Sequence, residues 1–263
     1  AWYWGAQGPD FFFCHRIMPF NQGASLWPYG TALPDKKPSE VFNAMRDFLR
    51  RNPDDKVYRS YAMGFVNHYT LDSTVHPYVK VLIDELKQER PGEDTSDIHH
   101  EIEAALDTII LRYETGKLPQ EVSMSKFLPK DHPVMRKIAR LYKYVIFEVM
   151  GDNVSESDIF TAEKDARFVY GLLTDRTTMK KKIFDSIEKN RRKLVSSHFM
   201  PMTEDPEIDY ANTCHEPWKN GDEVTGMDFF EMFDIATEQS LEMISVYDSC
   251  DFAQITQEKP FSF

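Results

Sequence analysis

The stretch GFVNHYTLDSTVHPYV (residues 64–79) places His68, Asp72 and His76 at steps of four residues in an otherwise apolar segment. Residues four apart on an α-helix lie on the same face, one turn above each other. His68 and Asp72 are therefore expected to point the same way, while Pro77 favours a helix break near His76. The spacing predicts a helical face that carries two imidazoles and a carboxylate.

Helical patterning extends over most of the chain. Ser39 is placed to cap one helix, and Gly116 suits the end of a later one. Residues 1–38, rich in glycine, proline and aromatic side chains, predict a loop with one short helix, and residues 201–224 predict a polar loop. Strand patterns are scarce, which predicts an all-α fold, a single multi-helix bundle domain over residues 1–263. The predicted helical segments are 39–51, 55–73, 77–89, 98–116, 132–151, 155–173, 175–197 and 225–250.

The composition limits the classes of function. The chain has 263 residues, a formal net charge of -12 and three cysteines. Its basic runs are flanked by acidic residues, so the charge disfavours nucleic acid as a partner and leaves at most peripheral contact with a membrane. No apolar run approaches the ~18 residues of a membrane span, and sparse cysteines fit a reducing compartment, so a cytoplasmic protein is expected.

Two further features carry potential metal ligands. His99 and Glu103, in HHEIE, repeat the four-residue spacing on a strongly helical segment, and Asp10 and His15 lie in the loop GPDFFFCH. Imidazole nitrogens and carboxylate oxygens are standard zinc donors. One such pair is more often an exposed ion pair or an ordinary hydrogen bond. Charged groups on an apolar helix face need a partner, however, and a cation would supply it.

A weaker candidate is the run of Cys214, His215 and Glu216. A cysteine and a histidine together could bind a metal or act as nucleophile and base. Adjacent residues rarely converge on one point, so we expect structural or surface roles for this run.

The combined motifs resemble the zinc-dependent phospholipase C family, which is similar to the single-strand-specific zinc nucleases. The resemblance rests on HYTLDSTVHP, on AMGFVN before it, on GAQGPDFFFCH upstream and on HHEIE downstream, and it covers roughly residues 3–110. It implies a helical bundle of the phospholipase C type that holds up to three zinc ions. Their ligands come from a His-x3-Asp…His segment and from a later His-x3-Glu segment.

The resemblance implies two zinc sites in this chain. The ligand sets are Asp10, His15, His68 and Asp72 for the first ion, and His76, His99 and Glu103 for the second. A third ion in the family uses the amino-terminal residue and a histidine well upstream of the Asp loop. No histidine precedes Asp10 here, so either that segment lies outside this chain or the third site is absent.

The implied activity is hydrolysis of a phosphodiester. Closely spaced zinc ions lower the pKa of a bound water and polarise a phosphoryl oxygen. Asp10 is the candidate general base, Asp72 would bridge the first zinc to the third ion, and Glu101 and Asp107 are candidates for orienting ligand imidazoles. The expected substrate is a phospholipid or a related small phosphoester. The alternatives are a nuclease-like metallohydrolase and a non-catalytic helical protein with a structural metal site.

Overall fold

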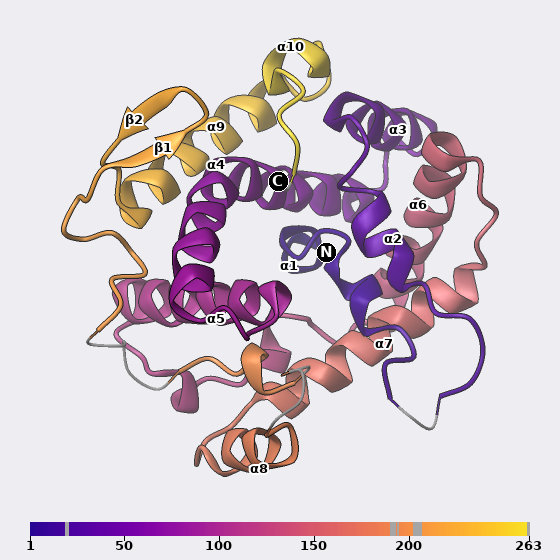
Figure 1. The fold of residues 1–263 in the computed structure, drawn as a ribbon. Helices are drawn as coiled ribbons and strands as arrows, with labels where there is room; N and C mark the ends of the chain where they lie inside the picture. Colours follow the sequence, from indigo (N-terminus) through magenta and orange to yellow (C-terminus); the bar gives the residue numbers. More distant parts are fainter. Residues whose placement is uncertain (19–20, 190–192, 194, 202–206, 262–263) are drawn as a thin grey trace. The chain divides into compact units, whose positions relative to one another are not determined.

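The computed structural model describes residues 1–18, 21–189, 193, 195–201 and 207–261. Over these residues the chain is built from helices, loops and one small hairpin, which confirms the all-α prediction (Figure 1). The α-helices are α1 (Trp2–Ala6), α2 (Trp27–Ala32), α3 (Pro38–Arg51), α4 (Lys56–Glu89), α5 (Thr95–Thr115), α6 (His132–Met150), α7 (Glu156–Leu173), α8 (Met179–Ile187), α9 (Phe229–Val246) and α10 (Phe252–Thr256). The 3-10 helices are η1 (Asp10–Cys14), η2 (Pro119–Glu121), η3 (Met124–Lys126) and η4 (Ser196–His198). The hairpin pairs β1 (Trp218–Asn220) antiparallel with β2 (Glu223–Thr225).

The chain divides into two compact units, each assembled from separate parts of the sequence. The first unit comprises residues 1–74, 125–170 and 235–263, and the second unit comprises residues 75–124 and 171–234. Helices α4 and α9 each contribute residues to both units. The single domain expected over the whole chain therefore stays a prediction.

Helix α4 runs without interruption through Pro77, so the predicted break near His76 is wrong. A proline inside a helix removes one backbone hydrogen bond and crowds the carbonyl group four residues earlier, which costs about 3 kcal/mol. The side chains that follow at Tyr78, Val79 and Leu82 are buried. Burial of a large apolar side chain contributes about 1.5–3 kcal/mol, so these three together outweigh the cost of the proline.

Two glycines let the short helix α1 contact α4 directly within the first unit. A Cβ atom on Gly5 would lie 2.1 Å from the carbonyl oxygen of Tyr61 and 2.9 Å from the Cα of Gly64. A Cβ atom on Gly64 would lie 2.3 Å from the carbonyl oxygen of Trp2. Any side chain at either glycine would push the two helices apart, so Gly64 fixes where the N-terminal segment meets α4.

A buried pair of tyrosines anchors the loop that follows α1. Tyr61 of α4 and Tyr142 of α6 are fully buried, their hydroxyl oxygens lie 2.6 Å apart, and the Tyr61 hydroxyl donates to the carbonyl of Gly8 at 3.1 Å. The rings of Phe11 and Phe12 meet the Tyr142 ring edge to face, with centroids 5.2 and 5.1 Å away. The segment that carries Asp10 is therefore part of the first unit's core.

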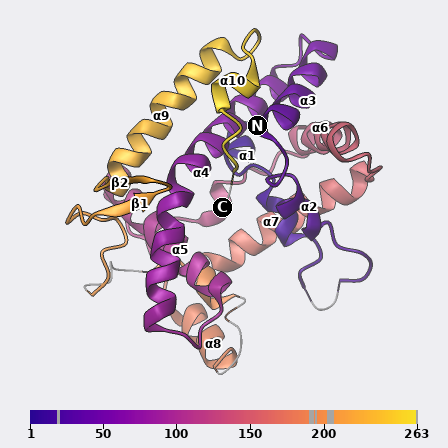
Figure 2. The ribbon, with the colours of Figure 1, turned by 45° about the horizontal axis from the view of Figure 1, so that its top comes forward.

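Helices α4 and α9 run alongside each other in the first unit (Figure 2). Thr74 donates to Gln239 Oε1 at 3.3 Å, and Ser240 donates to the side-chain oxygen of Asn67. These polar contacts fix the register of α9 against the part of α4 that carries His68.

The helix ends test two of the sequence signals. Gly116 ends α5 in the left-handed conformation (φ 66°), as predicted. The prediction that Ser39 caps α3 is wrong, because the helix begins one residue earlier at Pro38, a residue preorganised for the first helical position. The Ser39 hydroxyl instead donates to Glu258 Oε1 at 2.6 Å.

Some predicted segments extend outside the described residues. Residues 190–192 and 194 belong to the helix predicted over 175–197, and residues 202–206 belong to the predicted loop over 201–224. Among the described residues the single helix over 175–197 is wrong, because α8 ends at Ile187 and η4 begins separately at Ser196. That loop also contains the hairpin, which the sequence did not predict. Within the described ranges, no helix combines the length and the apolar character needed to cross a membrane.

Candidate metal centre

Helices α4 and α5 bring three potential metal ligands together in the second unit. His76 Nε2 lies 3.5 Å from Glu103 Oε1, and His99 Nε2 lies 3.0 Å from the same oxygen. One donor atom from each residue lies within 4.8 Å of the other two. The imidazole rings meet edge to face, with centroids 5.7 Å apart. The structure thus groups the same three residues that the resemblance assigned to one zinc ion.

The start of α5 positions two of these side chains. Asp94 caps the helix by accepting a hydrogen bond from the backbone of Ser96, and the four-residue step then places His99 and Glu103 on one face. The sequence spacing is therefore realised as a shared helix face, with His76 supplied by α4.

Glu101, expected to orient a ligand imidazole, makes a different set of contacts, and its expected role stays a prediction. Its carboxylate accepts hydrogen bonds from both guanidinium nitrogens of Arg90, at 2.9 and 3.1 Å, and from the Tyr210 hydroxyl at 2.8 Å. Loss of water alone would raise the pKa of Glu101, but these hydrogen bonds outweigh it and lower the pKa. Glu101 therefore ties the end of α4 to α5 and to the loop that precedes the hairpin.

The electrostatics of Glu103 favour a charged carboxylate. Loss of water around the carboxyl would raise its pKa, but the hydrogen bonds and charges of His76 and His99 outweigh this and hold the pKa of Glu103 well below its usual range. The group therefore stays ionised at neutral pH. In the metal-free chain the two Nε2 atoms reach this carboxylate as proton donors, and a metal ion that takes the three side chains as ligands would replace those protons.

Asp107 lies one turn beyond Glu103 on α5, and its pKa is shifted in the opposite direction. The protein around its carboxyl, and to a smaller extent the charge of Glu103, raises the pKa of Asp107 in the metal-free chain. The side chain is nevertheless exposed, so water limits this shift. The pKa values of the two acids on this helix are therefore shifted in opposite directions.

Two further histidines lie near the three donors. The rings of His100 and His198 approach within 4.0 Å between centroids, and the His100 ring is nearly parallel to that of His99, at 5.8 Å. Loss of water lowers the pKa of His198, although nearby carboxylates including Glu103 oppose the shift. A neutral imidazole at this position avoids adding positive charge beside the candidate cation site.

The donor set fits zinc. Two histidines and one glutamate are the protein ligands of one class of catalytic zinc site, which leaves a fourth position for water or substrate. Metal–ligand bonds of about 2.1 Å at tetrahedral angles put neighbouring donor atoms about 3.4 Å apart. The separations from Glu103 Oε1 to the two imidazoles, 3.0 and 3.5 Å, lie on either side of that value.

The ligands expected for the first zinc do not converge in the same way. His68 Nε2 lies 3.4 Å from Asp72 Oδ2 on α4, but among the described residues neither Asp10 nor His15 completes a group of three converging donors with this pair. The Asp10 loop does reach His68, because Gly8 (φ 54°) packs against the ring, where a Cβ atom would lie 2.1 Å away. The structure thus assembles one predicted ligand pair and places the Asp10 loop beside it.

His15 is poorly suited to the ligand role that the resemblance implied. The backbone N–H of Leu26 donates to His15 Nδ1 at 2.8 Å, so this nitrogen carries no proton. Burial lowers the pKa of His15, which favours the neutral ring with its single proton on Nε2. Nδ1 is thus committed as an acceptor, and the proton on Nε2, a buried atom with no hydrogen-bond partner among the described residues, would have to leave before that nitrogen could bind a metal.

No family model, curated protein or solved structure matches the chain. A function therefore has to be argued from the geometry of His76, His99 and Glu103 and from the motifs that carry the resemblance.

Proposed function

We propose that the chain is a zinc-dependent phosphoric diester hydrolase of the phospholipase C type. The observation that carries the proposal is the convergence of His76, His99 and Glu103 from two helices on one point, with separations that suit zinc. The motifs around His68 and Asp72 add the family resemblance. That resemblance also implies a second zinc ion at this pair.

The protein side of the chemistry follows from the three side chains. His76 and His99 present Nε2 atoms to the site, and Glu103 supplies a carboxylate that its neighbours keep ionised. Zinc held there would supply a Lewis acid that activates water and polarises a phosphoryl oxygen. With three protein ligands, a fourth position stays open for the reacting group, which a purely structural four-ligand site would not leave.

Two carboxyls are candidates for moving the proton. Asp107 lies one turn beyond Glu103 on α5, so its carboxylate is a candidate to take a proton from water and later return it. The general-base role expected for Asp10 remains a prediction, because Asp10 belongs to the first unit.

The charge of the chain supports a substrate with little net negative charge over a polyanion. A net charge of -12 repels nucleic acid and anionic lipid surfaces, so a zwitterionic phospholipid or a small soluble phosphodiester fits better than a polynucleotide. The nuclease-like alternative is thereby disfavoured.

The deciding experiment compares Glu103→Gln with Glu114→Gln. Glu114 is an exposed residue of the same helix, so its substitution makes the same chemical change away from the three donors. Zinc per chain is measured by elemental analysis, and hydrolysis is measured with bis(p-nitrophenyl) phosphate, phosphatidylcholine vesicles and single-stranded DNA. We expect Glu103→Gln to weaken zinc binding at least tenfold and to lower kcat/KM at least 100-fold, while Glu114→Gln behaves as wild type.

Three outcomes would overturn the proposal in different ways. Wild-type protein that binds less than one zinc per chain would remove the metal centre itself. Bound zinc without hydrolysis of any of the three substrates would replace the enzyme with the structural-metal alternative. Cleavage of DNA in preference to phosphatidylcholine would replace the phospholipase with the nuclease-like alternative.

A further inference from the structure

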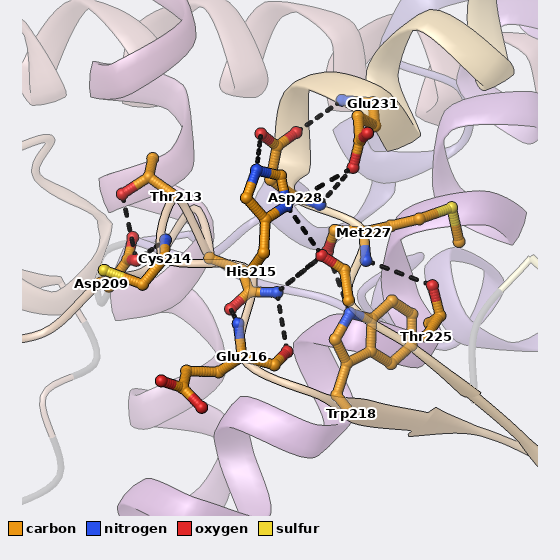
Figure 3. A network of polar contacts seen from close by, with 12 residues as sticks. Asp209, Thr213, Cys214, His215, Glu216, Trp218, Thr225, Met227, Asp228 and Glu231 are labelled. Atoms are coloured by element: carbon orange, nitrogen blue, oxygen red, sulfur yellow. Dashed lines mark hydrogen bonds and ion pairs between the residues drawn. The ribbon is translucent and has the colours of Figure 1, made fainter.

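A second group of potential metal ligands lies in the second unit, apart from the motifs that carry the resemblance, and it includes His215 from the weaker candidate run. His215, Asp228 and Glu231 each place one donor atom within 4.8 Å of the other two. His215 Nε2 lies 3.9 Å from Asp228 Oδ2, and His215 Nδ1 lies 3.8 Å from Glu231 Oε2 (Figure 3). Both separations exceed hydrogen-bond length, so the imidazole faces the two carboxylates without bonding to either.

Buried polar contacts hold the turn that presents His215. The buried side chain of Asn212 accepts from the backbone of Glu216 at 3.0 Å and donates to the carbonyls of Glu216 and Met227, both at 3.1 Å. Gly226 fits closely under the turn, since a Cβ atom there would lie 3.0 Å from the His215 carbonyl oxygen. The result is a fixed turn in which His215 adopts φ 53°, a conformation uncommon for residues other than glycine.

The hydrogen bond at Nδ1 prepares the opposite nitrogen for a metal. His215 Nδ1 lies 3.0 Å from the carbonyl oxygen of Gly226, which can only accept, so Nδ1 carries the proton. In the neutral ring Nε2 then holds a free lone pair on the side that faces Asp228. A backbone carbonyl that fixes the tautomer in this way is the usual support for a metal-binding histidine.

The two carboxylates also cap α9, and each keeps one oxygen free of that role. The backbone N–H of Glu231 donates to Asp228 Oδ1 at 2.7 Å, and the backbone N–H of Asp228 donates to Glu231 Oε2 at 3.0 Å. This reciprocal capping box is complete without a histidine. It leaves Asp228 Oδ2, the oxygen nearest to His215 Nε2, outside the cap. The imidazole therefore adds a nitrogen donor to two carboxylates whose positions the helix start already fixes.

We propose that His215, Asp228 and Glu231 bind a divalent transition-metal ion, of which Zn²⁺ and Co²⁺ are suitable probes. The site is separate from the His76 centre, and the proposal does not rest on the proposed phosphodiesterase activity. One nitrogen and two carboxylate oxygens suit such an ion, with water in the remaining positions. Closing the 3.9 Å separation between His215 Nε2 and Asp228 Oδ2 to the roughly 3.4 Å of a tetrahedral site requires a small rotation of the exposed His215 side chain toward the largely covered Asp228 carboxylate.

The local electrostatics favour a cation despite the partial positive charge at the N-terminus of α9. The N-terminus of a helix carries about half a positive charge, whereas two ionised carboxylates carry about two full negative charges. The bound ion would link the turn at His215 to the first turn of α9 and so close the segment that contains the β1–β2 hairpin. Its role is therefore to stabilise this part of the second unit.

Trp218 provides a local reporter. It is buried, and its Nε1 donates to the Met227 carbonyl at 3.0 Å, next to the Gly226 carbonyl that holds His215. The other three tryptophans, Trp2, Trp4 and Trp27, belong to the first unit. Quenching of Trp218 fluorescence by Co²⁺ therefore reports an ion at this turn. The Trp218 signal is obtained by subtracting the fluorescence of a Trp218→Phe variant.

The test uses substitutions that keep the turn and the cap but remove donors. Asn at position 215 tolerates positive φ, Asn at 228 is as good an N-cap as Asp, and Gln at 231 keeps the capping box. The background protein is the full chain with His99→Ala, a substitution that disables the centre formed by His76, His99 and Glu103. It is treated with a chelator and then titrated with Co²⁺ and with Zn²⁺. The same background then receives His215→Asn, Asp228→Asn or Glu231→Gln, with Glu216→Gln as the matched control in the same turn.

We expect saturable quenching with one ion per chain, a Kd raised at least tenfold by each donor substitution, and no change with Glu216→Gln. Thermal unfolding of the metal-free variants should match that of the background. Equal Co²⁺ affinity in His215→Asn and in the His99→Ala background, or no quenching in either protein, would overturn the proposal. If the Asp228 and Glu231 variants fail to fold, the comparison with His215→Asn alone decides. Failure of the zinc centre at His76 would leave this result unchanged, so the two proposals fail separately.

Discussion

Glu163→Gln should make the stability of the first unit less dependent on pH. Glu163 is fully buried in α7, and within the described part of the chain neither of its carboxyl oxygens has a hydrogen-bond partner. Burial raises the pKa of Glu163 well above its ordinary value. The folded chain therefore keeps a proton at this carboxyl over a pH range in which the unfolded chain has released it.

The sign and size of the effect follow from proton linkage. Because the folded state binds the extra proton, the wild-type free energy of unfolding falls as pH rises above the unfolded pKa of about 4.3. The fall is about 1.4 kcal/mol for each pH unit through which the folded chain keeps the proton. Glutamine carries no titrating proton, so the stability of Glu163→Gln relative to that of wild type should rise with pH at this rate.

Urea unfolding at pH 5, 6 and 7 measures this relative stability. Tryptophan fluorescence is a suitable signal, because three of the four tryptophans lie in the first unit with Glu163. A chelator in every sample removes any contribution from metal. Glu238→Gln makes the same change at an exposed site of α9 in the same unit. A relative stability of Glu163→Gln that stays constant over the three pH values, or that follows the Glu238→Gln control, would refute the reasoning.

Three further outcomes are expected. Gly8→Ala should destabilise the chain by at least about 2 kcal/mol in thermal or urea unfolding, because it adds a Cβ at φ 54° against a histidine ring. Gly92 has open space around it, so Gly92→Ala should change the stability by less than about 1 kcal/mol. Tyr142→Phe should cost about 1 kcal/mol, because it removes a buried hydrogen bond between two tyrosine hydroxyls. Burial, with smaller contributions from nearby carboxylates, raises the pKa of the Cys14 thiol to about 12. Iodoacetamide at pH 8 should therefore alkylate the exposed Cys214 in the native chain and Cys14 only after unfolding. Peptide mass spectrometry measures the labelling at each cysteine. Early labelling of Cys14, or equal effects of the two glycine substitutions, would contradict the corresponding packing argument.

Helix positions were largely predictable because apolar periodicity is a local property of the sequence. Gly116 marks a helix end by its own backbone freedom, and the structure places it there. Pro77 and Ser39 show the limit of such signals. Packing around α4 outweighs the helix-breaking tendency of one proline, and a neighbouring proline, not the serine, sets the start of α3.

The two candidate metal sites differ in how much the sequence could indicate. His99 and Glu103 are four residues apart on one helix, so their shared face follows from helix geometry, and only the approach of His76 needed the fold. His215 and Asp228 come together only because a hairpin closes between them. The sequence signal that could have pointed there is the Asp228-x-x-Glu231 capping box before an apolar run, which locates the helix start but not the histidine.

The glycine contact between α1 and α4 also constrains the order in which the chain can assemble. Helix α1 has five residues, far fewer than the roughly 12–15 that an isolated helix needs in water. Its partner residue Gly64 follows Gly5 in the sequence, so α1 gains this contact only once the N-terminal part of α4 has been synthesised. The other parts of the first unit, residues 125–170 and 235–263, are added later still. Docking of α1 on α4 can therefore be an early step in the assembly of this unit.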